Sequence, residues 1–268
     1  MPRTLRAPGL PSPRRILMGQ VSLRARRHLG RWLDHLAPRA CALCGAALAA
    51  GALSGVCTGC LLDLPGAARE RCPRCALPMA GSPCLCTADS GTADSGTTDP
   101  WPLDAALAVA DYAPPFDRLI HALKFGHQLA LARPLGELMA TAWLGQTDPP
   151  ALDCLIPVPL GPERLRTRGF NQSLEMARAM SRCLGDRLPV LAHSLARRRN
   201  TPEQSRLGLA QRRANLTDAF VVHGRLEGCR VGLVDDVMTS GSTAIAAAQA
   251  LKAAGAVRVT ALLAARTG

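Results

Sequence analysis

The chain has 268 residues, of which 48% are hydrophobic and only 3% aromatic, and its formal net charge is +12. This composition excludes a disordered protein and favours one large or two small globular domains with an aliphatic core. No run of 18 apolar residues is present, so no transmembrane helix is expected. The beginning of the chain lacks the apolar core of a secretion signal, and we therefore do not expect secretion.

The first 40 residues are strongly basic, because they hold nine arginines and a single acid, Asp34. Four prolines within the first 13 residues make this beginning a poor helix, whereas residues 16–37 could form an amphipathic basic helix. Two interpretations stay open for residues 1–40. We favour a disordered segment, with Met18 as the true start, over an arm that binds nucleic acid or anionic lipid.

Eight of the eleven cysteines fall within residues 41–86 and form four closely spaced pairs. Two thiolates two residues apart are half of a tetrahedral zinc site, so four pairs predict one or two structural Zn²⁺ ions in a double zinc ribbon. The simplest pairing assigns the first four cysteines to one site and the last four to the other, but an interleaved pairing also fits the spacing. The predicted ligands are Cys41, Cys44, Cys57, Cys60, Cys72, Cys75, Cys84 and Cys86.

Disulfide bonds are the competing explanation for these cysteines, and they require an oxidising compartment to which nothing in the sequence directs the chain. The segment holds few large apolar residues, so metal binding would have to supply the stability that a core cannot. Zinc ribbons either bind nucleic acid or protein, or have a purely structural role. The sequence favours neither of these two roles.

Residues 101–268 alternate apolar strands with helical stretches, after a Thr-Ala-Asp-Ser-Gly repeat at residues 87–100 that predicts a flexible linker. This order predicts an α/β domain with a mostly parallel sheet flanked by helices. Ligands of such sheets bind at the carboxyl ends of the strands. Strands are predicted at 105–110, 154–157, 231–234 and 257–264, and helices at 117–126, 129–143, 172–184 and 244–254.

Two further segments are rich in arginine, and the first of them follows a predicted strand. Arg164, Arg166 and Arg168 follow the strand at 154–157, and guanidinium groups bind phosphate oxygens two at a time. The alternative is a solvated turn before the next helix. The second segment begins at Arg197, and we interpret it as a mobile arm that closes over the site, in preference to a plain surface loop.

Residues 230–243 read Arg-Val-Gly-Leu-Val-Asp-Asp-Val-Met-Thr-Ser-Gly-Ser-Thr and carry the most informative pattern. A strand is followed by two acids, Asp235 and Asp236, and then by hydroxyl residues around Gly241 and a helix that ends near Gly255. Unpaired N–H groups and the dipole at the start of a helix bind anions, and glycine allows close approach of a phosphate. Two carboxylates beside a phosphate site suit the hydroxyls of a ribose. A plain capped turn would need one acid only.

This pattern resembles the phosphoribosyl-diphosphate (PRPP) binding motif of type I phosphoribosyltransferases. The resemblance implies that Asp235 and Asp236 hold the ribose hydroxyls and that residues 239–243 wrap the 5′-phosphate. Ser240 replaces the commoner threonine and keeps its hydroxyl. The PRPP-binding residues implied within the motif are Val234, Asp235, Asp236, Met238, Thr239, Ser240, Gly241, Ser242 and Thr243.

A wider set of features resembles the ComF family. These are the cysteine-rich beginning, Lys-Phe-Gly at 124–126, Ile-Pro-Val-Pro at 156–159, Arg-x-Arg-Gly-Phe-Asn-Gln at 166–172 and Arg-Asn-Thr-Pro-x-Gln-Ser at 199–205, besides the motif. The resemblance implies a cytoplasmic bacterial protein with a type I phosphoribosyltransferase-like domain after a double zinc ribbon, linked to DNA uptake and single-stranded DNA. It adds Lys124, Arg168, Asn171, Gln172, Thr201 and Gln204 to the pocket, and the arginine cluster adds Arg164.

The expected chemistry is transfer of a phosphoribosyl group from PRPP oriented by Mg²⁺. Asp235 and Asp236 would stabilise positive charge at C1′, and Lys124 with Arg164 or Arg168 would take the charge of the departing diphosphate. Nothing identifies the acceptor, and no residue stands out as a base. The alternative is a non-catalytic competence factor that senses PRPP and binds single-stranded DNA. A scaffold that recruits a helicase-like partner is a third, weaker option.

Overall fold

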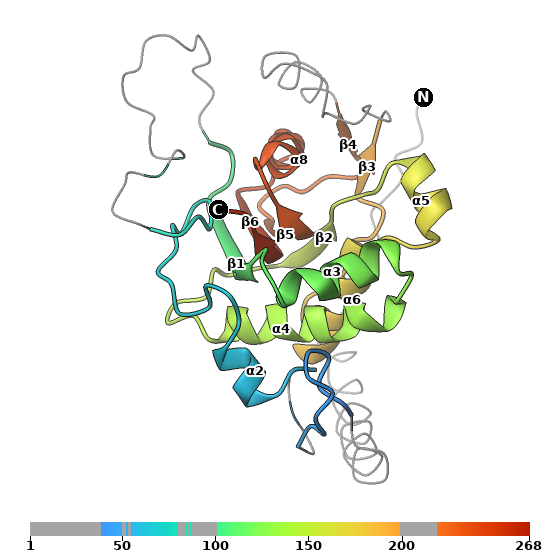
Figure 1. The fold of residues 1–268 in the computed structure, drawn as a ribbon. Coiled ribbons are helices and arrows are strands. Elements are labelled where there is room, and N and C mark those ends of the chain that lie inside the picture. Colours follow the sequence, from blue (N-terminus) through green and yellow to red (C-terminus); the bar gives the residue numbers. More distant parts are fainter. Residues whose placement is uncertain are drawn as a thin grey trace, which may run out of the picture.

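The computed structural model of the protein describes residues 39–49, 52, 55–79, 84, 86, 101–198 and 219–268. Its centre is a four-stranded sheet in the order β1-β6-β5-β2, and every pairing in it is parallel (Figure 1). A parallel bridge between Leu155 and Val190 extends the sheet beyond β2. The strands are β1 (Ala105–Asp111), β2 (Cys154–Pro157), β5 (Arg230–Met238) and β6 (Arg258–Arg266).

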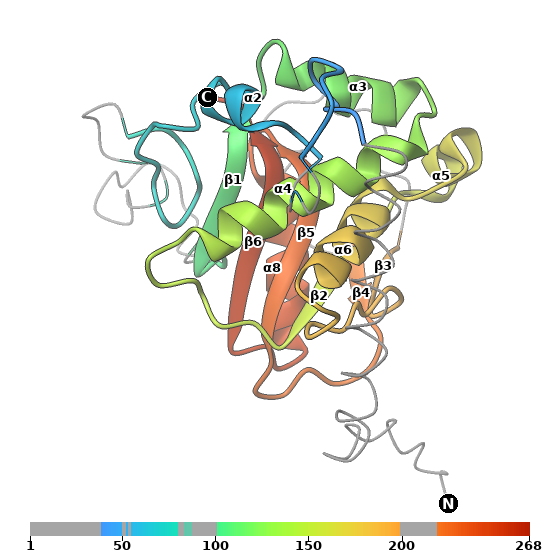
Figure 2. The same cartoon turned by 90° about the horizontal axis from the view of Figure 1, so that it is seen from below.

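Helices cover both faces of this sheet, which confirms the predicted α/β architecture. Helices α3 (Phe116–Phe125), α4 (Ala132–Leu144) and α6 (Gln172–Cys183) lie on one face, and α8 (Ser242–Ala253) lies on the other (Figures 1 and 2). Because both faces are buried, the strands are continuous apolar runs rather than alternating ones. Alternate residues of β5 serve the two cores, since Val234 packs toward α4 and α6 whereas Leu233 packs toward α8.

The element boundaries differ from the sequence prediction in ways that matter for the site. Strand β5 continues through both acids to Met238, instead of ending at residue 234. The helix predicted at 129–143 begins with a 3₁₀ turn, η1 (Leu129–Leu131), before α4. Three further elements after residue 101 were not predicted: α5 (Pro162–Arg168) and the antiparallel pair β3 (Leu195–Arg197) and β4 (Phe220–Val222).

The first half of the cysteine-rich part packs against the face of the sheet that carries α3, α4 and α6. It includes a short helix, α2 (Thr58–Leu62), and its buried residues Leu48, Val56 and Leu64 belong to the same hydrophobic cluster as Leu135 of α4 (Figure 2). Residues 1–38 and 87–100 lie outside the described part, so the predicted basic segment and linker stay predictions. Among the described residues, no helix is long and apolar enough to cross a membrane.

Candidate functional site

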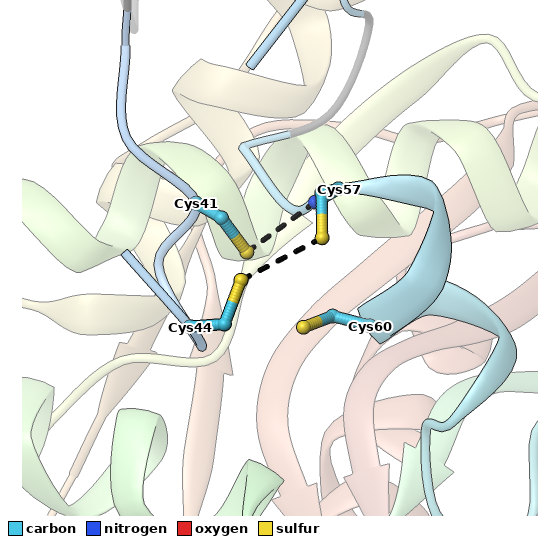
Figure 3. A group of neighbouring side chains, drawn as sticks. All are labelled: Cys41, Cys44, Cys57 and Cys60. Atoms are coloured by element: carbon cyan, nitrogen blue, oxygen red, sulfur yellow. Dashed lines mark hydrogen bonds between the residues drawn. The ribbon is translucent and has the colours of Figure 1, made fainter. Parts of the chain in front are cut away.

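Two groups of four cysteines gather in the folded chain. Cys41, Cys44, Cys57 and Cys60 form the first cluster (Figure 3), and Cys72, Cys75, Cys84 and Cys86 form the second. Within each cluster all four sulfurs lie within 4.8 Å of one another, and none of the eleven cysteines forms a disulfide. The sequential pairing is therefore confirmed and the interleaved one is wrong. Four sulfurs around one Zn²⁺ ion would be about 3.8 Å apart, and the Cys44 and Cys57 sulfurs are 3.7 Å apart.

Both clusters begin with the same tight turn, which explains why these spacings hold two sulfurs on one side. The N–H of Gly45 donates to the carbonyl of Cys41, and the N–H of Ala76 donates to that of Cys72, each at 2.9 Å. The residue after the second cysteine is left-handed in both turns, with φ of 74° at Gly45 and 57° at Ala76. This chain reversal also brings backbone N–H groups toward the first sulfur of each pair.

Those N–H groups favour the ionised form of the first thiol of each cluster. Burial opposes the charge on Cys41, but N–H groups including that of Cys57 at 3.3 Å bring the pKa of Cys41 down to about 6. The pKa of Cys72 is lowered to about 7 in the same way. A hydrogen bond with Cys44 is the main cause that raises the pKa of Cys60. Further thiolates would repel the first, and a divalent cation would remove that repulsion, so the donor set fits zinc.

A second constellation forms at the carboxyl end of β5. Asp235 accepts hydrogen bonds from the Ser173 hydroxyl at 3.0 Å and from the N–H of Asp236 at 2.9 Å. Asp236 is only 3% exposed, and its Oδ1 lies 2.9 Å from Lys124 Nζ of α3. The other oxygen, Oδ2, is buried without a hydrogen-bond partner in the described part of the chain. Asp235 is therefore the more exposed of the two acids. Asp236 forms an ion pair with Lys124 through Oδ1, and its Oδ2 stays available as an acceptor.

The environment of these acids is unfavourable to a second negative charge. Burial and the neighbouring Asp236 raise the pKa of Asp235 from 3.8 to about 7, although the N–H of Asp236, Lys124 and the Ser173 hydroxyl oppose the shift. Asp235 keeps part of its side chain accessible to solvent. A ligand that donates hydroxyl hydrogen bonds, or a cation, would restore the charged form. The site is thus poised for a polyhydroxylated or cationic group.

The segment after β5 has the backbone geometry that an anion site requires. Thr239 and Ser240 are exposed, and α8 begins directly afterwards at Ser242. Gly241 precedes the helix with φ of 79°, a left-handed conformation that favours glycine. The start of α8 therefore offers unpaired N–H groups beside exposed hydroxyls. Val234 and Met238 are buried, and their carbonyls accept hydrogen bonds from the N–H of Val158 and from Arg266, so both residues serve the fold of this segment.

Arg168 reaches the same region from the end of α5. Its Nη1 donates to Gln172 Oε1 at 2.5 Å, and its guanidinium lies 5.6 Å from the centre of the Phe125 ring. Burial lowers the pKa of Arg168, the charge of Asp236 raises it, and the charge of Arg164 lowers it. Arg164, Arg168 and Lys124 therefore bring positive charge to this side of the site, which favours a multiply charged anion.

The remaining predicted residues divide into two groups. Asn171 caps α6, since its Oδ1 accepts from N–H groups of the first turn and its Nδ2 donates to the carbonyl of Val158 at 3.1 Å. Its side chain is thus engaged in holding the segment that carries Arg168 and Gln172. Thr201 and Gln204 lie outside the described residues. Their place in the pocket stays a prediction.

Sequence reasoning missed two residues that the fold brings to this region. Ser173 is 1% exposed and hydrogen-bonds Asp235, but a serine in the first turn of a helix is too common to signal a site. Arg266 is 5% exposed at the end of β6, and it donates to the carbonyl of Met238 at 2.8 Å. A lone arginine closing an apolar strand was a signal that could have revealed it.

Comparisons with known proteins find relatives that match most of the chain. No family model matches the chain. The DNA utilization protein YhgH of Escherichia coli O6:H1 is 36% identical over 228 residues, covering 83% of this chain and 94% of that protein. The protein of the same name from Salmonella typhi is 34% identical over the same length. Competence protein F of Haemophilus influenzae is 34% identical over 146 residues, covering 52% of this chain and 63% of that protein.

Solved structures with similarity to the chain are more distant. Glutamine PRPP amidotransferase from B. subtilis, complexed with ADP and GMP, is 22% identical and covers 51% of this chain and 26% of its own, with a TM-score of 0.35. Purine phosphoribosyltransferase from Pyrococcus horikoshii is 20% identical and covers 58% and 74%, with a TM-score of 0.28. At such values the functional argument rests on the residues of this chain.

Proposed function

The chain belongs to the ComF family, to which its motifs pointed, and from this premise we propose that it binds PRPP or a related phosphoribosyl metabolite at the carboxyl end of β5. The observation that carries the proposal is the meeting of two adjacent acids with the start of a helix that follows a left-handed glycine. A site made only of carboxylates would repel a phosphate, and a phosphate site at a helix start has no need of carboxylates. A ligand with hydroxyls beside its phosphate satisfies both.

The proposed ligand places each of its groups against matching residues. The 5′-phosphate lies against the exposed segment Thr239–Ser240 and the start of α8 at residues 241–243. The ribose hydroxyls donate to Asp235 and to the unpartnered Oδ2 of Asp236. The diphosphate lies toward Arg168, Arg164 and Lys124, with Lys124 released in part from Asp236.

Mg²⁺ is the cation that we propose to accompany the ligand. The ion would be held mainly by the diphosphate and by the ribose hydroxyls that Asp235 and Asp236 fix, since Mg²⁺ prefers oxygen ligands and is held partly by phosphates. When bound, the ion would neutralise charge on the diphosphate. The protein's own contribution is to fix the sugar with the acids and to receive the diphosphate among Lys124, Arg164 and Arg168, so that charge separation at C1′ is stabilised.

Calorimetric titration of PRPP with Mg²⁺ tests the binding proposal. We expect heat for the parent protein and at least tenfold weaker binding for Asp235→Asn and for Asp236→Asn, the loss typical of one charge-assisted hydrogen bond. Asp153→Asn is the matched control, because Asp153 pairs with Arg230 at the opposite end of β5. Absence of heat for the parent protein would remove the proposal. Equal weakening by the control would show an effect on the fold instead.

The same ligand site serves catalysis or sensing, and one measurement separates them. A phosphoribosyltransferase releases diphosphate from PRPP with at least one acceptor in a panel of bases and amines. A sensor binds PRPP without such release. The second candidate, a single-stranded-DNA-binding competence factor, is favoured by the exposed arginines Arg164 and Arg166 on α5 and by the name of the Escherichia coli relative, DNA utilization protein YhgH. It predicts DNA affinity that falls steeply with salt.

A further inference from the structure

Arg266 joins the second cysteine cluster to the segment that follows β5. Its Nε donates to the carbonyl of Cys75 at 3.0 Å, across 191 residues of sequence. Its Nη1 donates to the carbonyls of Met238, at 2.8 Å, and Thr239, as well as to that of Thr267 at 2.7 Å. One buried guanidinium therefore holds the cysteine turn with one nitrogen and the start of the anion segment with another.

The charge of Arg266 is unusual for a buried arginine, because no carboxylate pairs with it among the residues that the structure describes. An uncompensated buried charge is costly, and arginines at such positions normally have an anionic partner. The Cys75 carbonyl that accepts from Nε at 3.0 Å belongs to a predicted zinc ligand, so the guanidinium lies beside the second cluster. Four thiolates around one Zn²⁺ carry a net charge of −2, so the metal-loaded second cluster supplies the missing counter-ion.

Trp101 makes a second link between the same two regions. Its Nε1 donates to the carbonyl of Arg74 at 3.2 Å, and Arg74 in turn donates to the carbonyl of Cys86 at 3.3 Å. The far edge of the Trp101 ring lies next to Gly241, 3.5 Å from the position that a Cβ would take there. The second cluster is thus linked to the anion segment at two points, Met238 through Arg266 and Gly241 through Trp101.

The first cluster has no such link in the described chain, although its turn is built in the same way. Arg39, which precedes it, pairs with Glu137 of α4 at 3.2 Å. Gly55 lies directly against Pro134 at the beginning of the same helix. The contacts of the first cluster therefore stabilise the face of the sheet that carries α4, and not the segment after β5. The two clusters therefore share the same turn geometry but contact different parts of the molecule.

We propose that Arg266 is a positioning residue through which metal in the second cluster sets the geometry of the anion segment at residues 238–243. Loss of metal there leaves the guanidinium without its counter-ion and loosens its hold on the carbonyls of Met238 and Thr239. The first cluster has no such effect. The consequence for ligand affinity rests on the proposed function, whereas the effect on the segment itself does not.

Two single substitutions separate this proposal from a general loss of stability. Cys84→Ser removes a ligand of the second cluster, and Cys44→Ser removes one of the first; neither side chain is fully buried. Zinc content is measured first, and each variant should lose one ion per chain. Hydrogen exchange is then followed in the ligand-free proteins. We expect amides of residues 238–245 to exchange roughly tenfold faster or more in Cys84→Ser, as for loss of one charge-assisted hydrogen bond, and at the parent rate in Cys44→Ser.

Arg266→Lys supplies the test of the residue itself. Lysine keeps the charge but cannot reach Cys75 and Met238 at once, so exchange of the same amides should rise while zinc content stays at the parent level. In the double variant Arg266→Lys/Cys84→Ser the two effects should not add. Equal exchange in the two cysteine variants, or additivity in the double variant, would overturn the proposal. Titration of PRPP with Mg²⁺ into the same proteins then reports on the ligand separately, and its failure would leave the exchange result standing.

Discussion

Replacing Asp235 with asparagine should stabilise the protein, and the gain should grow with pH. Burial and the adjacent Asp236 raise the pKa of Asp235 from 3.8 to about 7 in the folded protein. Because the folded pKa lies above the unfolded one, the unfolded chain loses this proton first as pH rises. Stability therefore falls from about pH 4 to about pH 7 and stays reduced above that. Asparagine has no such proton, and its oxygen can still accept from Ser173.

The size of this effect follows from the shift. Roughly three pKa units at 1.36 kcal/mol each give an upper value of about 4 kcal/mol above the folded pKa. At pH 5.5 the parent protein has already lost roughly half of this stability. The stability advantage of Asp235→Asn should therefore increase by about 2 kcal/mol between pH 5.5 and 8.5.

Urea unfolding of the parent protein and Asp235→Asn at several pH values measures this difference. The range should stay above about pH 5.5, because protonation of thiolates would release zinc at lower pH. Asp153→Asn, at the exposed pair with Arg230, is the control and should not show the same growing advantage. Parallel stability curves for the parent protein and Asp235→Asn would refute the claim that Asp235 is held in a desolvated, like-charged site.

Further predictions concern the pieces that surround the site. Lys124→Ala leaves the Asp236 carboxylate buried without its partner and should cost about 3–5 kcal/mol in urea unfolding, whereas the double variant with Asp236→Asn should recover most of it. Gly241→Ala forces a left-handed alanine and should cost roughly 1–2 kcal/mol, together with weaker PRPP binding by calorimetry. Gly136→Ala would place a methyl group 2.4 Å from the Met176 carbonyl and should lower stability by about 1–3 kcal/mol without changing the site, as shown by unchanged ligand affinity per folded protein. Elemental analysis of the purified protein should find two zinc ions per chain, and a chelator that removes them should expose the cysteine-rich part to proteolysis.

Several features of the molecule were readable from local sequence patterns. The strand at 154–157 was predicted with its observed bounds, and α3, α6 and α8 were each placed within two residues. Such elements depend on side-chain periodicity and on caps such as Asn171, which act over a few residues. Strand β5 was predicted too short, because Asp235 and Asp236 resemble the end of a strand although the ladder with β6 continues past them.

The chain's own order of residues determined the α/β class, the tight turns of the cysteine pairs and the succession of strand, acids, glycine and helix. Only the tertiary structure decided which cysteine pairs share a cluster, that Lys124 meets Asp236, and that Arg266 reaches Cys75. The reason is physical: local patterns act over a turn of helix or a few strand residues. Contacts across the molecule depend on the strand order β1-β6-β5-β2, which brings β5 and β6 together at the centre and gathers their carboxyl ends beside the second cluster.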